Sequence, residues 1–125
     1  IMAKKFFKCR HCGNVIVKVV DSGVPVVCCG EEMEELIPNT VDASGEKHVP
    51  VVTKLGGEKI LVEVGSVPHP MESSHHIVFI LVETDKGCIR VDLTDEPEAI
   101  ICVQDATVIA VYEYCNIHGL WKAEL

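Results

Sequence analysis

The sequence predicts an all-β protein, in which a small unit stabilised by a bound metal precedes an antiparallel β-sandwich. Two observations support this fold class. Four cysteines lie within residues 1–30, at Cys9, Cys12, Cys28 and Cys29. From residue 49 onward, short runs rich in β-branched residues alternate with turn signals, and no convincing amphipathic helix appears. Many short strands at this spacing are typical of an antiparallel sandwich.

The first unit is expected to span residues 1–37 and to contain both cysteine pairs. Residues 13–27 predict a β-hairpin with its turn near Asp21, and residues 31–36 predict at most one helical turn. Such a piece has little hydrophobic core of its own. A bound metal would therefore supply much of its stability.

The second unit is expected to span residues 38–125, beginning with a polar loop. Its predicted strands are residues 49–55, 59–64, 76–83, 88–93, 100–103 and 107–114. Cys88 and Cys102 fall within these strands. Because a cysteine in such a place is most often a small buried hydrophobic residue, we expect both side chains to be buried.

Composition indicates a folded, reduced protein. Hydrophobic residues make up 48% of the chain and charged residues 24%, as in globular domains. The chain contains seven cysteines, and no secretory signal sequence is recognisable, so metal-bound thiolates in a reducing cytoplasm are favoured over a disulfide framework. The longest apolar runs have the length of strands and cannot span a bilayer.

The formal net charge of -8 argues against nucleic acid as a partner, because phosphate binding requires a basic face. Neither a membrane nor a nucleic acid is therefore expected to bind. An acidic surface is compatible with docking to a partner of complementary charge. It also means that an anionic substrate would need local positive charge.

The first cysteine cluster has the spacing of a four-thiolate metal site. Cys9 and Cys12 are separated by two residues, and Gly13 allows the tight turn that follows them. Cys28 and Cys29 are adjacent, which should distort a tetrahedral site, and this favours iron over zinc. The alternatives are a structural zinc ion or a disulfide between the adjacent cysteines.

A second group of metal-ligand side chains lies at predicted strand ends or in loops. Its members are His48, His69, His75, His76, Cys115 and His118. Any one of these histidines alone would be an ordinary surface or capping residue. The Cys115-x-x-His118 spacing, together with histidines beside proline-restricted turns, predicts a second metal site.

Several motifs of the chain resemble the desulfoferrodoxin family of two-iron superoxide reductases. In the second unit these are Glu46-Lys47-His48-Val49-Pro50, His69-Pro70-Met71-Glu72 with a histidine six positions after the first, and Tyr114-Cys115-Asn116-Ile117-His118-Gly119. The four-cysteine pattern is similar to the desulforedoxin-type N-terminal domain of that family. The resemblance covers nearly the whole chain, in both order and spacing.

The resemblance implies two iron ions per chain. One would be held by the four cysteines in a desulforedoxin-like or rubredoxin-like knuckle. The other would be a ferrous centre in an immunoglobulin-like β-sandwich, with equatorial imidazoles from His48, His69, His75 and His118 and an axial thiolate from Cys115. Only the spacing from His69 selects His75 rather than His76 as a ligand.

The implied activity is superoxide reduction by an oxidoreductase that takes superoxide as its acceptor. One electron and two protons would convert superoxide to hydrogen peroxide, and an external donor such as rubredoxin would reset the iron. Lys47 is expected to attract superoxide and Glu46 to occupy the sixth position of the oxidised iron. Members of the family are commonly homodimers, and related reductases function without the N-terminal domain.

Two other functions remain open from the sequence. The chain could be a rubredoxin-like electron carrier that uses only the four-cysteine iron. It could also be a module in which both metals are structural. A visible spectrum together with metal analysis distinguishes these alternatives from the reductase, because zinc in both sites would give a colourless protein.

Overall fold

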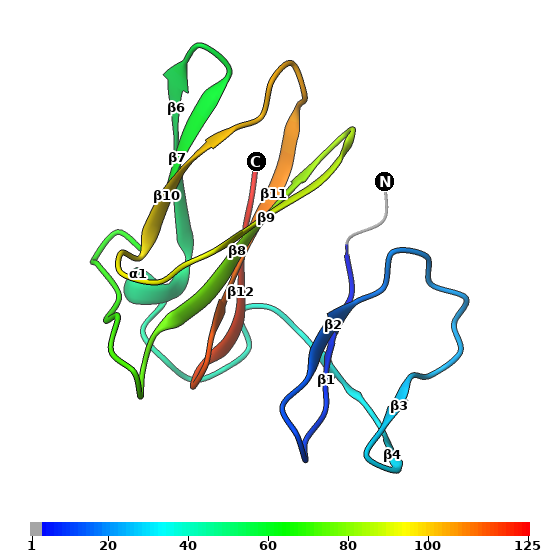
Figure 1. Cartoon of the computed structure of the whole chain (residues 1–125). Coiled ribbons are helices and arrows are strands. Elements are labelled where there is room, and N and C mark those ends of the chain that lie inside the picture. Colours follow the sequence, from blue (N-terminus) through cyan, green and yellow to red (C-terminus); the bar gives the residue numbers. More distant parts are fainter. Residues whose placement is uncertain (1–3) are drawn as a thin grey trace. The chain divides into compact units, whose positions relative to one another are not determined.

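The computed structural model describes residues 4–125, which form two compact units, residues 4–37 and Pro38–Leu125. Both units consist of antiparallel strands, and the helix α1 (Gly45–His48) is a single turn (Figure 1). The predicted all-β fold is confirmed. Within residues 4–125, no helix has the length and apolar character needed to cross a membrane.

The first unit contains a three-stranded sheet and a separate short hairpin. The sheet has the order β2-β1-β5 and the hairpin pairs β3 with β4. Their bounds are β1 (Phe6–Lys8), β2 (Val15–Val17), β3 (Val27–Cys28), β4 (Glu31–Glu32) and β5 (Glu34–Leu36). Phe6, at 2% exposure, lies on the central strand and is the largest buried side chain of this unit.

The predicted hairpin over residues 13–27 is wrong. β2 pairs with β1, whereas β3 pairs with β4, so the two ends of this stretch belong to different ladders. The loop between them is held by side chains. Asp21 accepts hydrogen bonds from the Gly23 amide at 2.8 Å and from Lys18 Nζ at 2.9 Å, and Lys18 Nζ also donates to the Val24 carbonyl at 2.8 Å.

The predicted helical turn over residues 31–36 is also wrong. Glu31 pairs with Cys28 in the hairpin, and Leu36 pairs with Phe6 in the sheet. Pairing with strands distant in the sequence has overridden the local helix propensity of the glutamates.

The second unit is a sandwich of two sheets, with the orders β10-β7-β6 and β12-β11-β8-β9. The strand bounds are β6 (Pro50–Gly56), β7 (Lys59–Val64), β8 (Ile77–Thr84), β9 (Gly87–Asp92), β10 (Glu98–Cys102), β11 (Val108–Cys115) and β12 (Gly119–Glu124). Every predicted strand is present, with ends shifted by at most two residues. The sequence argument missed β12, which contains no β-branched residue.

The strand connections are immunoglobulin-like. In chain order, the second strand of the sandwich (β7) lies between the first (β6) and the fifth (β10). The sixth strand (β11) lies between the third (β8) and the seventh (β12). These are the neighbours of the immunoglobulin fold, except that the fourth strand, β9, joins the sheet of the third strand.

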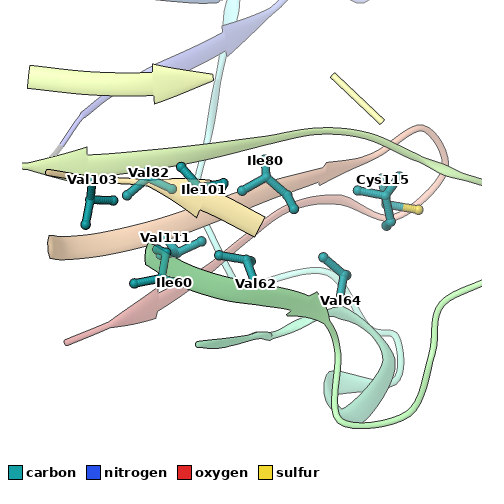
Figure 2. Close-up of a cluster of buried hydrophobic side chains, with 10 residues drawn as sticks. Ile60, Val62, Val64, Ile80, Val82, Ile101, Val103, Val111 and Cys115 are labelled. Carbon is teal, nitrogen blue, oxygen red and sulfur yellow. The ribbon is translucent and has the colours of Figure 1, made fainter. Parts of the chain in front are cut away.

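The core fills the space between the two sheets (Figure 2). Alternate residues of β7, namely Ile60, Val62 and Val64, point inward and are at most 3% exposed. Val111 and Cys115 of β11 join them from the opposite sheet. Figure 2 shows the sulfur of Cys115 at one end of this cluster.

A register shift between β8 and β11 places Ile77 opposite Cys115. Tyr114 pairs with Phe79, but the next residue, Cys115, pairs with Ile77. This irregularity lets Cys115 and Ile77 share the inner face, and both have 0% exposure. Cys115 itself continues the alternation of Val111 along β11, so the irregularity redirects Ile77 rather than the cysteine.

The expectation that Cys88 and Cys102 are buried is wrong, since both are exposed. Alternation along the strands explains this result. Ile89 and Ile101, the neighbours of these cysteines, pack toward the core, so the cysteines point to the outer faces of their sheets.

Candidate metal centres

The first half of the four-cysteine site is a tight turn after β1. The Cys9 carbonyl accepts the Gly13 amide at 3.1 Å, and Gly13 has a φ of 82°, a conformation that favours glycine. The amides of His11 and Cys12 donate to Cys9 Sγ at 3.4 and 3.5 Å. The turn therefore stabilises negative charge on this sulfur.

The second half is the turn of the β3-β4 hairpin, which explains the adjacent cysteines. Cys29 and Gly30 are the two turn residues, and their φ values of 51° and 77° are positive, as a type I′ turn requires. Cys28 ends the strand and Cys29 begins the turn, so the change of backbone direction lets both side chains serve one site. Asn14 Nδ2 donates to Cys28 Sγ at 3.6 Å.

The four sulfur atoms all lie within 4.8 Å of one another. None of the four is in a disulfide, which excludes the vicinal disulfide in this structure. The amide of Cys12 lowers the pKa of Cys9 to about 6, whereas hydrogen bonds with the crowded thiols of Cys9, Cys12 and Cys28 raise the pKa of Cys29 to about 12. A cation would favour the thiolate form of all four, so this donor set fits a thiophilic metal.

The second candidate centre brings together five side chains of the sandwich unit. Their nitrogen and sulfur donor atoms lie within 4.8 Å of one another, and the members are His48, His69, His75, Cys115 and His118. They come from α1, from the segment between β7 and β8, from the end of β11 and from the β11-β12 turn. Residues up to 70 positions apart in the chain therefore meet at one end of the sandwich.

Hydrogen bonds to the backbone orient two of the imidazoles. His48 Nδ1 lies 2.7 Å from the Ser44 carbonyl, and His69 Nδ1 lies 2.7 Å from the Pro70 carbonyl. Because a carbonyl only accepts, each Nδ1 carries the proton, and each Nε2 keeps its lone pair for a metal. These two Nε2 atoms are 3.1 Å apart.

The other two imidazoles also direct a nitrogen toward the centre. His75 Nε2 is buried and has no hydrogen-bond partner among residues 4–125, as expected for an atom that binds a metal. His118 turns Nδ1 inward, 3.1 Å from His48 Nε2. By contrast, the His76 ring is bonded through Nδ1 to the Glu72 carbonyl at 2.9 Å, and the structure brings His75 rather than His76 into the group.

Burial favours the neutral form of two histidines of this centre. Desolvation lowers the pKa of His69 to about 4 and also lowers the pKa of His48. The charge of Lys47 lowers the pKa of His48 further, while the hydrogen bond to the Ser44 carbonyl opposes the shift. Neutral imidazoles are the form that binds a metal, so burial prepares His48 and His69 to bind one.

The Cys115 sulfur closes the group from the core side, 3.5 Å from His69 Nε2. Burial raises the pKa of this thiol, while the amide of His118 donates to the sulfur at 3.4 Å and opposes the rise. A thiol without charge compensation would stay protonated here. A bound cation supplies that compensation, so the donor set of four imidazoles and one thiolate fits a transition metal.

Trp121 holds two of the five members in place, and the sequence argument assigned it no role. Its indole stacks on the His48 ring, with centroids 4.8 Å apart and planes 24° apart, and its Nε1 donates to the His118 carbonyl at 3.0 Å. The available sequence signal was the position of Trp121, three residues after His118. Because β12 was not predicted, the sequence could not show that Trp121 faces the interior of the sandwich.

Glu113 is a second residue that the sequence argument missed. It lies two positions before Cys115, is 0% exposed, and neither carboxylate oxygen has a hydrogen-bond partner within the described chain. Burial raises the pKa of Glu113 to about 9, so the side chain is a neutral carboxylic acid.

Glu46 and Lys47 lie on α1 immediately before His48, and both are exposed. The structure thus places them beside the five-donor group, and Lys47 lies close enough for its charge to affect the pKa of His48. Their roles in chemistry remain predictions.

Comparison with known proteins gives the family. Residues 40–124 match the family model for desulfoferrodoxin, and residues 3–36 match the model for the desulfoferrodoxin N-terminal domain. The chain belongs to the desulfoferrodoxin family. It is 48% identical over 122 residues to a desulfoferrodoxin of Desulfarculus baarsii, an alignment that covers 94% of each chain.

Solved structures agree with this family membership. A crystal structure of the superoxide reductase from Treponema pallidum matches with a TM-score of 0.81 and 33% identity, over 98% of this desulfoferrodoxin and 100% of that chain. A superoxide reductase from Nanoarchaeum equitans matches with a TM-score of 0.54 and 31% identity, over 66% of this chain and 94% of that one. The four-cysteine group and the five-donor group correspond to the two metal-binding domains of the family.

Proposed function

We propose that this desulfoferrodoxin is a superoxide reductase that converts superoxide to hydrogen peroxide. The observation that carries the proposal is the buried group of four imidazoles and one thiolate in a chain whose relatives include superoxide reductases. An electron carrier would need only the four-cysteine site. The five-donor group would then have no purpose.

The number of protein donors would leave room for substrate at a bound iron ion. The four imidazoles and the Cys115 thiolate would hold an iron ion, which would supply one electron to superoxide, and these five donors would leave the metal accessible to substrate. Cys115 provides an electron-rich sulfur, whose basicity the His118 amide moderates through its hydrogen bond. The carbonyls of Ser44 and Pro70 hold His48 and His69 in the tautomer that the centre requires.

Lys47 and Glu46 are assigned complementary roles at this centre. The Lys47 ammonium attracts the anion locally, which overcomes the repulsion expected from a net charge of -8. Glu46 would supply a carboxylate that competes with the product for the metal and so helps the product leave. Their support is their place on α1, directly before His48.

The four-cysteine unit is assigned an accessory role as an electron-transfer or structural iron domain. Four thiolates fill a tetrahedral ion completely, so no position remains for substrate. We assign residues 1–37 to this domain and residues 38–125 to the catalytic domain. A cytoplasmic location, a homodimeric state and an external electron donor such as rubredoxin complete the proposal.

The proposal is tested by following superoxide decay after pulse radiolysis in the presence of the reduced, iron-loaded protein. The protein should consume superoxide far faster than buffer. Lys47→Ala should slow this reaction roughly tenfold at low ionic strength, with a smaller difference at high salt, because screening weakens attraction between exposed charges. A decay rate equal to that of buffer would refute the function. An unchanged rate in Lys47→Ala would remove only Lys47 from the mechanism.

A further inference from the structure

The segment between β7 and β8 carries His69 and is also hydrogen-bonded to α1. The Val67 amide donates to the Glu46 carbonyl at 2.9 Å, and Ser66 Oγ donates to the same carbonyl at 3.2 Å. The His69 amide donates back to the Val64 carbonyl at 2.9 Å. One loop therefore fixes both a predicted ligand and the backbone immediately before Lys47.

Gly65 is the point of closest approach between this loop and α1. A Cβ atom at Gly65 would lie 2.7 Å from the Glu46 carbonyl oxygen, 2.9 Å from the Val49 carbonyl oxygen and 3.1 Å from the Lys47 carbonyl carbon. All three are backbone atoms, so no flexible side chain can move aside. At every other glycine of residues 4–125, an added Cβ would meet nothing closer than 3.5 Å.

The part of α1 that would yield is its exposed side. His48 is 2% exposed, stacks on Trp121 and is bonded to the Ser44 carbonyl. Glu46 and Lys47 are exposed and lack such packing. A methyl group at Gly65 would therefore displace the Glu46–Lys47 backbone more than the His48 imidazole.

We propose that Gly65 is a positioning residue, whose missing side chain lets the loop hold Lys47 at the distance from the five-donor centre at which its ammonium attracts an anion. This proposal rests on the role assigned to Lys47 under the proposed function. Ser66 and Val67 support the same placement through their two hydrogen bonds to the Glu46 carbonyl.

A double-mutant cycle on the iron-loaded protein tests the proposal. Gly65→Ala should reduce the superoxide rate constant roughly tenfold and flatten its dependence on ionic strength, since a misplaced charge steers less well. In a Lys47→Ala background, Gly65→Ala should cause no further loss. Gly45→Ala is the matched control, because the added methyl in α1 meets open space and should change nothing.

A second measurement does not depend on superoxide turnover. Azide can be titrated into the oxidised protein and followed by the visible absorption of the ferric centre. Gly65→Ala should weaken azide binding by the same factor as Lys47→Ala, and the double variant should bind no more weakly than either. If the wild-type protein fails to consume superoxide, the proposed function fails while this titration still decides the role of Gly65.

Ser66→Ala provides a second test in case the Gly65→Ala variant does not bind iron. It removes one hydrogen bond to the Glu46 carbonyl and leaves the Val67 amide in place, so a loss of roughly twofold is expected, and it too should vanish in Lys47→Ala. If the loss of rate or azide affinity caused by Gly65→Ala or Ser66→Ala adds to the loss caused by Lys47→Ala in the double variant, the proposal is wrong. Unchanged azide affinity in both Gly65→Ala and Ser66→Ala would also overturn it.

Discussion

The Cys115 sulfur shows how single residues determine the chemistry of the second centre. It is completely buried, where a thiolate is costly, yet it accepts the amide of His118 and faces the donor nitrogens of the histidines. The sequence identified this residue from its spacing to His118. It could not predict the burial, because that requires knowing which face of β11 packs against the other sheet.

Cys115→Ser tests whether Cys115 supplies the thiolate of the second centre. The oxidised iron-loaded protein should show an absorption band from charge transfer between thiolate and ferric iron, and this band should disappear in the variant. A serine oxygen is a harder and weaker electron donor than a thiolate, so the superoxide rate should fall as well. Retention of the band would mean that another sulfur ligates the iron.

Asp21 and Lys18 offer a pH prediction in the first unit. The Lys18 ammonium, with help from the Gly23 amide, lowers the pKa of Asp21 to about 2 from its usual 3.8. Since the folded-state pKa is the lower one, the interaction stabilises the fold above pH 3.8 and is lost as the pH falls toward 2. Lys18→Met should raise the pKa of Asp21 toward 3.8, measured by carbon-13 NMR of the carboxyl group in zinc-loaded protein. An unchanged pKa would contradict the role of Lys18.

At the scale of structural elements, local sequence signals correctly predicted the strands that bury one face. β7 alternates between inward residues such as Ile60 and Val62 and more exposed neighbours, and its predicted bounds match the structure. β12 lacks β-branched residues, and the hairpin of β3 and β4 pairs glutamates with Val27 and Cys28. Pairing with other strands creates these elements, and such pairing cannot be read from their own residues.

The site was predicted more completely than the fold around it. Proline-restricted turns and the Cys115-x-x-His118 spacing predicted a second metal site with six candidate ligands, because metal binding restricts residue type and spacing more tightly than packing does. The family resemblance then selected five of the six. Trp121 and Glu113 were missed. Their importance comes from facing the interior beside the centre, which requires the register of β11 and β12.

Glu113 gives a stability prediction at the scale of the β11 strand. A buried polar group without a partner destabilises the folded state, and methionine has a similar length without that cost. Glu113→Met should raise the free energy of unfolding by about 1–3 kcal/mol. Chemical denaturation of the wild-type protein and the variant, each with both metals bound, measures the difference. A loss of stability would show that the carboxyl group has a favourable interaction.

At the scale of the whole molecule, two compact units each contain one candidate metal centre. The four-cysteine centre stabilises a unit with three short strands in its sheet and a two-stranded hairpin, which alone offer little core. The five-donor centre lies at one end of an immunoglobulin-like sandwich that has an extensive hydrophobic core of its own. We therefore expect the two metals to contribute differently to folding and to activity.

Cys12→Ser separates these contributions. Loss of one thiolate should release or weaken iron in the first centre and lower the thermal stability of that unit. Superoxide consumption by the pre-reduced second centre should be unchanged, because its ligands all lie between residues 38 and 125. Metal analysis and pulse radiolysis on the same sample check both statements. A large fall in the superoxide rate, with iron still in the second centre, would contradict the accessory role.

The stoichiometry of the reaction tests the central claim most directly. The fully reduced, iron-loaded protein is mixed with less superoxide than its second iron can reduce, and hydrogen peroxide and dioxygen are both measured. Reduction by the protein predicts one hydrogen peroxide for each superoxide consumed, no dioxygen, and one oxidised second centre for each turnover. Half that yield of peroxide, with an equal amount of dioxygen, would show dismutation and contradict the account.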